Sequence, residues 1–291
     1  MSDRLLLTGI LLATGLAWGS TQTLGKIAVS TGHGPLGLIF WQLAIGVAVL
    51  LPLAGRFRVG RRQLGFAVLI ATIGTLIPNT TFYLSVAHLP AGIMSIIIAA
   101  VPMLAFPIAL ALGMDRAGAG RIAGIICGLA GVAMIAAPGG GLPAGAALWL
   151  PVALVGPLFY AIEGNVVARW GTSGMSALQA MALVSAVGAV MALPLALVSG
   201  QWIDPRAAFG AAEGALVASS IAHAFAYVAY VWLAARAGAV FAAQVSYIVT
   251  GSGVIWAMVI LGERFPPMVW AALVLMLAGL ALVAPRDRAA V

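Results

Sequence analysis

The chain has 291 residues, of which 63% are hydrophobic and only 7% are charged. Soluble domains carry about 25% charged residues, so a soluble fold of this composition would lack a polar surface. A lipid bilayer, in contrast, tolerates an apolar surface. The formal net charge is +7, but the basic residues stand mostly singly between apolar runs. This spacing indicates loop anchors at lipid headgroups rather than a nucleic-acid partner.

Apolar segments long enough to cross a bilayer follow one another along the whole chain. A spanning helix needs about 20 largely apolar residues. We expect ten spans, at residues 4–28, 34–54, 62–87, 90–113, 119–137, 146–168, 175–198, 212–235, 238–261 and 267–285. Two of the breaks are weak, and they are placed at His88-Leu89-Pro90 and at Arg236-Ala237-Gly238 because the joined segments would be far too long for one span. The sequence therefore predicts an all-α membrane protein with ten transmembrane helices.

The basic residues are divided unevenly between the two ends of this predicted bundle. Ten spans place both termini on one side of the membrane. Three basic residues, Lys26, Arg206 and Arg264, lie on the opposite side, and the other eleven lie on the side of the termini. Because short loops rich in Lys and Arg stay in the cytoplasm, we expect both termini to be cytoplasmic.

A shift of 148 residues relates the two halves of the chain. Leu129-Ala130-Gly131-Val132-Ala133 then lies over Leu277-Ala278-Gly279-Leu280-Ala281, and Gly113-Met114-Asp115-Arg116 lies over Leu261-Gly262-Glu263-Arg264. Five spans per half is an odd number, so the halves, residues 1–145 and 146–291, would have opposite orientations in the membrane. Inverted repeats are common in secondary transporters, where substrate binds near the midplane between the halves.

Several of these residues together resemble a known family. They are Leu16-Ala17-Trp18-Gly19-Ser20 with Lys26 in the first span, the turn Gly262-Glu263-Arg264, and the glycine-rich fifth and tenth spans. Over nearly its whole length the chain resembles the ten-helix, EamA-type drug/metabolite transporter superfamily, and in overall character it is similar to bacterial amino-acid and aromatic amino-acid exporters. One departure is Met114-Asp115, where the family's usual turn reads Gly-Glu.

The resemblance implies a 5+5 inverted repeat in the bacterial inner membrane that works by alternating access. It also implies a central cavity lined by helices 1, 3, 4, 6, 8 and 9. Helices 5 and 10 would lie outside this cavity, as scaffold or as the contact of a homodimer.

Polar and aromatic residues within the spans form stripes at helical spacing. Such residues are costly in lipid, so we expect them to face the protein interior. Thr75, Asn79 and Tyr83 share one face, and the 148-residue shift places Asn79 on Tyr227 of the eighth span. The predicted substrate-binding residues are Trp18, Gln22, Trp41, Asn79, Tyr83, Tyr160, Glu163, His223, Tyr227, Gln244 and Tyr247. The alternative is that these residues only bond helix to helix, at about 1 kcal/mol each, or, for Trp41, that the ring faces lipid.

Two of these residues are candidates for proton coupling. Glu163 is the only acid well inside a predicted span, and histidine, here His223, titrates near neutrality. Alternatively, Glu163 pairs with Arg169 or reaches the headgroups, and His223 makes an ordinary interhelical hydrogen bond. Pro78 and Pro157 lie beside two of the stripes, so we expect them to act as hinges.

We expect no catalytic site, metal site or cofactor. His33, His88 and His223 are far apart in sequence, the single cysteine excludes a CxxC site, and there is no P-loop. The leading hypothesis is a secondary transporter that exports small metabolites, above all aromatic or bulky apolar amino acids. One alternative is an efflux carrier for cationic drugs, in which neutralising Glu163 should affect transport more than in an amino-acid exporter. The other is an integral membrane enzyme, which would need a convergent acid/His or metal site.

Overall fold

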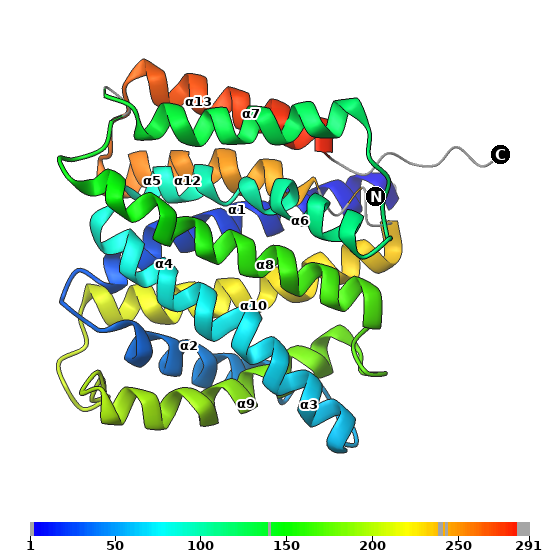
Figure 1. The fold of residues 1–291 in the computed structure, drawn as a ribbon. Helices are drawn as coiled ribbons and strands as arrows, with labels where there is room; N and C mark the ends of the chain where they lie inside the picture. Colours follow the sequence, from blue (N-terminus) through cyan, green and yellow to red (C-terminus); the bar gives the residue numbers. More distant parts are fainter. Residues whose placement is uncertain (1–2, 139–140, 238–240, 242–243, 284–291) are drawn as a thin grey trace.

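The computed structural model describes residues 3–138, 141–237, 241 and 244–283. Within these ranges the regular structure is entirely helical, and no residue there lies in a β-strand. The helices run back and forth along one common direction, which is horizontal in Figure 1.

The helices of the first half are continuous or nearly so across each predicted span. They are α1 (Asp3–Ala28), α2 (Pro35–Leu50), α3 (Arg61–Ile70), the π-helical turn η1 (Ala71–Leu76), α4 (Ile77–His88), α5 (Ala91–Ile97), α6 (Ala100–Ala111) and α7 (Ala119–Ala136). The second half contains the short 3₁₀ turn η2 (Ala146–Trp149), α8 (Leu150–Trp170), α9 (Ala177–Val198), α10 (Ala211–Ala237), α12 (Val245–Leu261) and α13 (Pro267–Val283).

The helix boundaries agree closely with the predicted segments. Within the described residues, seven helical segments are long and apolar enough to cross a membrane, and α2, α12 and α13 are shorter apolar helices. The weak break at His88-Leu89-Pro90 is correct, since α4 ends at His88 and α5 begins at Ala91. Residues 238–240 and 242–243 of the predicted ninth span, and residues 284–285 of the tenth, lie outside the described residues.

The third predicted span is not a uniform α-helix. Pro78 has no N–H to donate to the preceding turn, and its ring crowds that turn. The chain passes this point as the wider turn η1, in which the Ile77 N–H donates to the Thr72 carbonyl five residues earlier. π-Turns inside α-helices are frequent at functional sites, and this one lies directly before the predicted stripe of Asn79 and Tyr83.

Each helix packs against a few other helices. α1 packs on α10 and α12, whereas α8 packs on α4 and α6. α2 packs on α9 and α10, α9 packs on α3, and α5 packs on α12. α7 and α13 approach most closely at glycines: a Cβ on Gly124 would lie 2.7 Å from the Gly279 carbonyl oxygen, and the reverse distance is also 2.7 Å. Figure 1 shows this last pair along one edge of the bundle.

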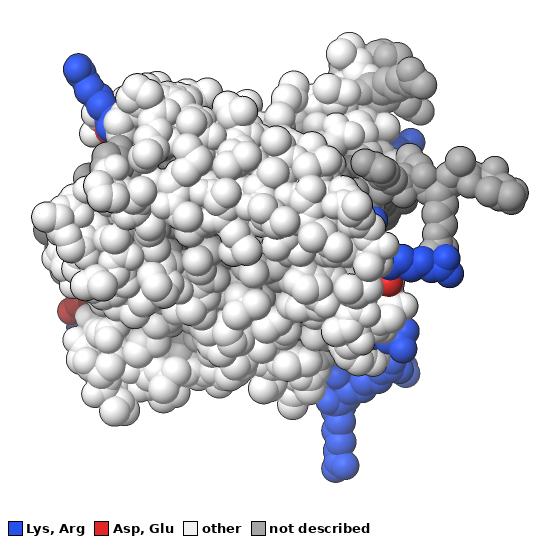
Figure 2. All heavy atoms as spheres, turned by 45° about the horizontal axis from the view of Figure 1, so that its top comes forward, with Lys and Arg blue, Asp and Glu red and all other residues white. Residues whose placement is uncertain are grey.

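The two ends of the bundle differ in charge. α1 begins and α13 ends at the same end (Figure 1). Basic side chains gather at that end in Figure 2. The helix α3, which begins with the exposed Arg61 and Arg62, starts at the same end (Figure 1), and the exposed Arg56 and Arg58 precede it in the α2–α3 connection. Between the two ends the visible surface is nearly free of charge (Figure 2), and many large apolar side chains are exposed. Such a band suits contact with lipid.

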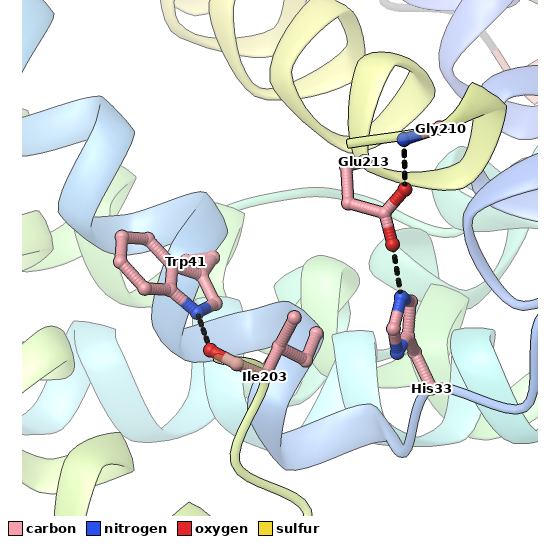
Figure 3. A network of polar contacts seen from close by, with 5 residues as sticks. All are labelled: His33, Trp41, Ile203, Gly210 and Glu213. Atoms are coloured by element: carbon pink, nitrogen blue, oxygen red, sulfur yellow. Dashed lines mark hydrogen bonds and ion pairs between the residues drawn. The ribbon is translucent and has the colours of Figure 1, made fainter. Parts of the chain in front are cut away.

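At the opposite end, the connection between α9 and α10 is fastened to the first two helices (Figure 3). The Nε2 atom of His33, in the turn after α1, lies 2.6 Å from a carboxylate oxygen of Glu213. The other Glu213 oxygen accepts a hydrogen bond from the Gly210 N–H at 2.8 Å. The Trp41 indole N–H donates to the Ile203 carbonyl at 3.0 Å. These contacts hold the long α9–α10 connection against α2.

Candidate functional site

A chain of polar side chains links three helices in the interior of the bundle. The Tyr160 hydroxyl of α8 donates to Asn79 Oδ1 of α4 at 3.0 Å. Asn79 Nδ2 and the Tyr83 hydroxyl both donate to Gln42 Oε1 of α2, at 3.4 and 3.0 Å. Asn79 and Tyr83 are buried. The predicted stripe of α4 thus meets the predicted Tyr160, and we call these four residues the amide–tyrosine chain.

A second group, the aromatic cluster, joins α1 to α10. The Trp18 indole N–H donates to His223 Nδ1 at 3.0 Å. The Trp18 ring also lies edge-on to His223, Tyr227 and Tyr230, with ring centroids 5.8, 6.2 and 5.8 Å apart. The predicted residues Trp18, His223 and Tyr227 are therefore brought together.

One face of α1 extends from the aromatic cluster towards the amide–tyrosine chain. Gly25 lies against α4, since a Cβ there would come within 2.6 Å of the Phe82 ring and 3.9 Å of Tyr83. Gln22 lies on the same face, between Trp18 and Gly25, at helical spacing. Its side chain is buried, and its Oε1 atom accepts no hydrogen bond from any described residue. A buried acceptor without a donor costs about 1–3 kcal/mol, which makes Gln22 a candidate for contact with a ligand.

Glu163 is an acid without a basic partner inside the bundle. It follows Tyr160 by about one turn of α8, and its carboxylate lies against Gly74 of η1, where a Cβ would be 2.5 Å from Cδ. In the described part of the chain it makes no ion pair, since the two pairs found there are His33–Glu213 and Arg121–Asp115. The alternative of a Glu163–Arg169 pair is not formed, and Arg169 is exposed.

The structure does not bring three of the predicted residues into this interior group. Trp41 packs with Phe40 and Trp202, with ring centroids 5.2 and 5.7 Å away, near the end of the bundle. Tyr247 packs among apolar residues of α6, α7 and α13. Gln244 is exposed at the residue before α12.

Two residues of the interior group were not predicted. Gln42 is the acceptor on which the amide–tyrosine chain converges, and it is a polar residue within an otherwise apolar helix, next to the chosen Trp41. Tyr230 lies about one turn after Tyr227 on the same face of α10. Following the α10 stripe one turn further would have revealed Tyr230, whereas Gln42 stands alone in α2 and belongs to no stripe. Among the described residues, no group of three or more His, Cys, Asp or Glu could hold a metal ion.

Lys26 and Glu263, which contribute to the family resemblance, act on backbone groups. Lys26 Nζ donates to the carbonyls of Val86, Ala87 and Leu89 at 2.6, 3.2 and 3.0 Å, where α4 ends. The Glu263 carboxylate accepts the N–H groups of Ala91 and Gly92 at 2.8 and 3.0 Å, where α5 begins. Helix ends leave such groups unpaired, and their partial charges favour a cation at the C-terminus and an anion at the N-terminus. The two residues thus clamp the α4–α5 break, and we call them the helix-end clamp.

A bundle of apolar helices with polar and aromatic side chains gathered inside it is typical of membrane transporters. The model of the EamA-like transporter family matches residues 7–137 and, a second time, residues 147–284. The chain therefore belongs to the EamA-like transporter family, which confirms the resemblance seen in the sequence and makes it a transporter rather than an enzyme.

Two individual proteins are similar to this chain over most of its length. A protein of Streptantibioticus cattleyicolor described as a probable terminal-alkyne amino-acid exporter is 26% identical over 280 residues, which cover 94% of this chain and 91% of that protein. A solved crystal structure has a TM-score of 0.64 at 17% identity, covering 95% of this chain and 96% of its own. The second likeness shows that the fold is shared.

Proposed function

We propose that this protein is a secondary transporter that exports amino acids with aromatic or bulky apolar side chains across the bacterial inner membrane by alternating access. The observation that carries the proposal is the gathering of the aromatic cluster and the amide–tyrosine chain along α1. Tyrosine and tryptophan rings offer apolar surface to a side chain, and the amides and hydroxyls offer hydrogen bonds to a zwitterion. The likeness to an amino-acid exporter supports the same substrate class.

The transport cycle that we propose rests on ten spanning helices in two inverted repeats, residues 1–145 and 146–291, with both termini cytoplasmic. Helix packing supports this plan, because related pairs occur twice. α1 packs on α10 and α12, and α8, its counterpart in the second half, packs on α4 and α6. The two successive family matches and the basic residues at the end where α1 begins support it as well.

The substrate site that we propose lies between these halves. It comprises the residues that the sequence predicted and that meet inside the bundle, together with Gln42 and Tyr230. Its members are Trp18, Gln22, Gln42, Asn79, Tyr83, Tyr160, Glu163, His223, Tyr227 and Tyr230. Trp41, Gln244 and Tyr247 are left out because their contacts lie elsewhere.

The test is uptake of a radiolabelled amino-acid panel into sealed proteoliposomes, with and without a pH gradient. We expect saturable uptake of one or more aromatic or bulky apolar amino acids. Uptake that is indifferent to the gradient would indicate facilitated diffusion, and uptake that follows it would indicate proton coupling. Absence of uptake for every amino acid, with insertion verified, would refute the proposal.

A second candidate is an efflux carrier for cationic drugs. The observation that favours it is the Glu163 carboxylate, which has no ion-pair partner among the described residues. Uptake of a labelled lipophilic cation without uptake of any amino acid, in the same vesicles, would decide for this candidate.

A further inference from the structure

We propose that the Glu163 carboxylate binds the ammonium group of the transported molecule, so that a free amino group is the feature by which this transporter selects its substrates. The inference rests on the proposed function for the identity of the substrate, an amino acid, but it makes a prediction of its own about charge.

The Glu163 carboxylate lacks a counter-charge among the described residues. Glu163 lies within α8, which extends from Leu150 to Trp170, and its carboxylate is directed at the neighbouring helix segment η1. A carboxylate inside a membrane protein is costly unless a cation or several hydrogen-bond donors accompany it. Glu163 is half-buried, and within the described residues its carboxylate has no ion-pair partner. A cationic group of the substrate would supply what is missing.

The carboxylate meets η1 at a glycine. Gly74 has no side chain, and a Cβ there would lie 2.6 and 2.7 Å from the two Glu163 carboxylate oxygens. The carboxylate therefore rests against bare backbone. Because Gly74 leaves this space open, the two carboxylate oxygens lie at the surface of η1.

A tyrosine lies beside the carboxylate on the same helix. Tyr160 precedes Glu163 by three residues of α8, so the two side chains are neighbours on one face, and the Tyr160 hydroxyl donates to Asn79 Oδ1 at 3.0 Å. Aromatic faces attract ammonium groups, and hydroxyl oxygens accept hydrogen bonds from them. An ammonium group has three donors and no acceptor, which matches this set of groups. A substrate carboxylate would be repelled from the same place.

The geometry changes the effect expected for Glu163→Gln. From the sequence alone, an amino-acid exporter was expected to lose less transport than a cation carrier. If the carboxylate holds the ammonium group, both kinds of substrate should suffer. Loss of a charge-assisted hydrogen bond corresponds to an apparent KM raised about 10- to 100-fold.

The first experiment needs no variant. In proteoliposomes, uptake of a transported amino acid is challenged with the decarboxylated amine, the N-acetyl derivative and the deaminated acid of the same side chain. We expect the amine to compete and the other two to fail. Competition by the N-acetyl derivative as strong as that of the parent amino acid would overturn the proposal.

The second experiment compares Glu163→Gln and Glu163→Asp with Asp204→Asn, which neutralises an exposed acid in the α9–α10 connection. We expect Glu163→Gln to raise KM, Glu163→Asp to restore part of the affinity, and Asp204→Asn to match the wild type. A Glu163→Gln protein with unchanged KM that has lost only its response to the pH gradient would show a proton carrier and overturn the proposal. Uptake that requires Na⁺ in the wild type and loses this requirement in Glu163→Gln would show a sodium site and overturn it too.

Failure of the proposed function can be told apart from failure of this inference. If no amino acid is transported but the labelled amine is, and Glu163→Gln raises its KM, the ammonium site stands and the amino-acid assignment falls. If amino acids are transported with the same KM by wild type and Glu163→Gln, the assignment stands and the ammonium site falls. Absence of flux for both amino acids and amines would overturn both.

Discussion

Replacing Glu263 by alanine should destabilise the folded protein by about 3 kcal/mol. The carboxylate accepts two backbone N–H groups, from Ala91 and Gly92, at 2.8 and 3.0 Å. Hydrogen bonds to a charged group contribute about 1.5–3 kcal/mol each, which gives roughly 3–6 kcal/mol for the pair. Glu263 is partly exposed, so water replaces part of the loss and the lower figure applies. Ala91 itself is fully buried, so water cannot replace all of it.

The assay is the free energy of unfolding from an SDS titration in mixed micelles, with helicity as the readout. Glu263→Gln keeps one acceptor oxygen and should lie between alanine and wild type. Asp204→Ala, which removes an exposed acid at the same end of the bundle, serves as the control. If Glu263→Ala and Asp204→Ala lose the same small amount, below about 1 kcal/mol, the helix-end clamp contributes nothing to stability and the reasoning is refuted.

Three further predictions concern the site, the helix packing and the end of the bundle. Tyr83→Ala and Tyr227→Ala should lower transport while the protein still inserts, and wild-type uptake in both would remove these residues from the site. Gly279→Ala should cost about 1–3 kcal/mol of unfolding free energy by overpacking α7 against α13, whereas Gly65→Ala, which meets no atom within 4 Å, should be neutral or stabilising in the same titration. Glu213→Gln breaks a partly exposed ion pair to His33 in the turn after α1, so the loss of unfolding free energy should stay below about 1 kcal/mol. A larger loss in the same titration would contradict the assignment of this pair as a weak, partly exposed contact.

The helix boundaries could be predicted because the lipid surroundings determine them. Lipid leaves no partner for unpaired backbone groups, so apolar runs become helices and charges mark their ends. For this reason a break as faint as His88-Leu89-Pro90 was found correctly. The residues that hold this break, Lys26 and Glu263, were seen only as motif residues, because nothing in a sequence tells which distant backbone groups a charge will reach.

The candidate site was predicted where a stripe on one helix had a partner stripe on another. Asn79 meets Tyr160 in this way, and Trp18 meets His223. Gln42 was missed because a single polar residue makes no stripe, although two donors converge on it. Trp41 and Gln244 were chosen as residue types that suit a cavity, but the rotation of α2 and the start of α12 give them other surroundings. Rotation about a helix axis is set by packing, which the sequence shows only indirectly.

The irregular turn η1 has a neighbour at the same level. Gly156 of α8 lies against Pro78, two residues after η1 ends: a Cβ on Gly156 would be 3.5 Å from the Pro78 carbonyl oxygen. Pro157 follows Gly156 directly. Two weakened points on adjacent helices therefore touch. Because these points are in contact, we expect a bend of α4 at Pro78 to be accompanied by a bend of α8 at Pro157. Asn79 and Tyr160 lie within one turn of these prolines, so we expect their hydrogen bond to persist while the helix segments on either side of it move apart.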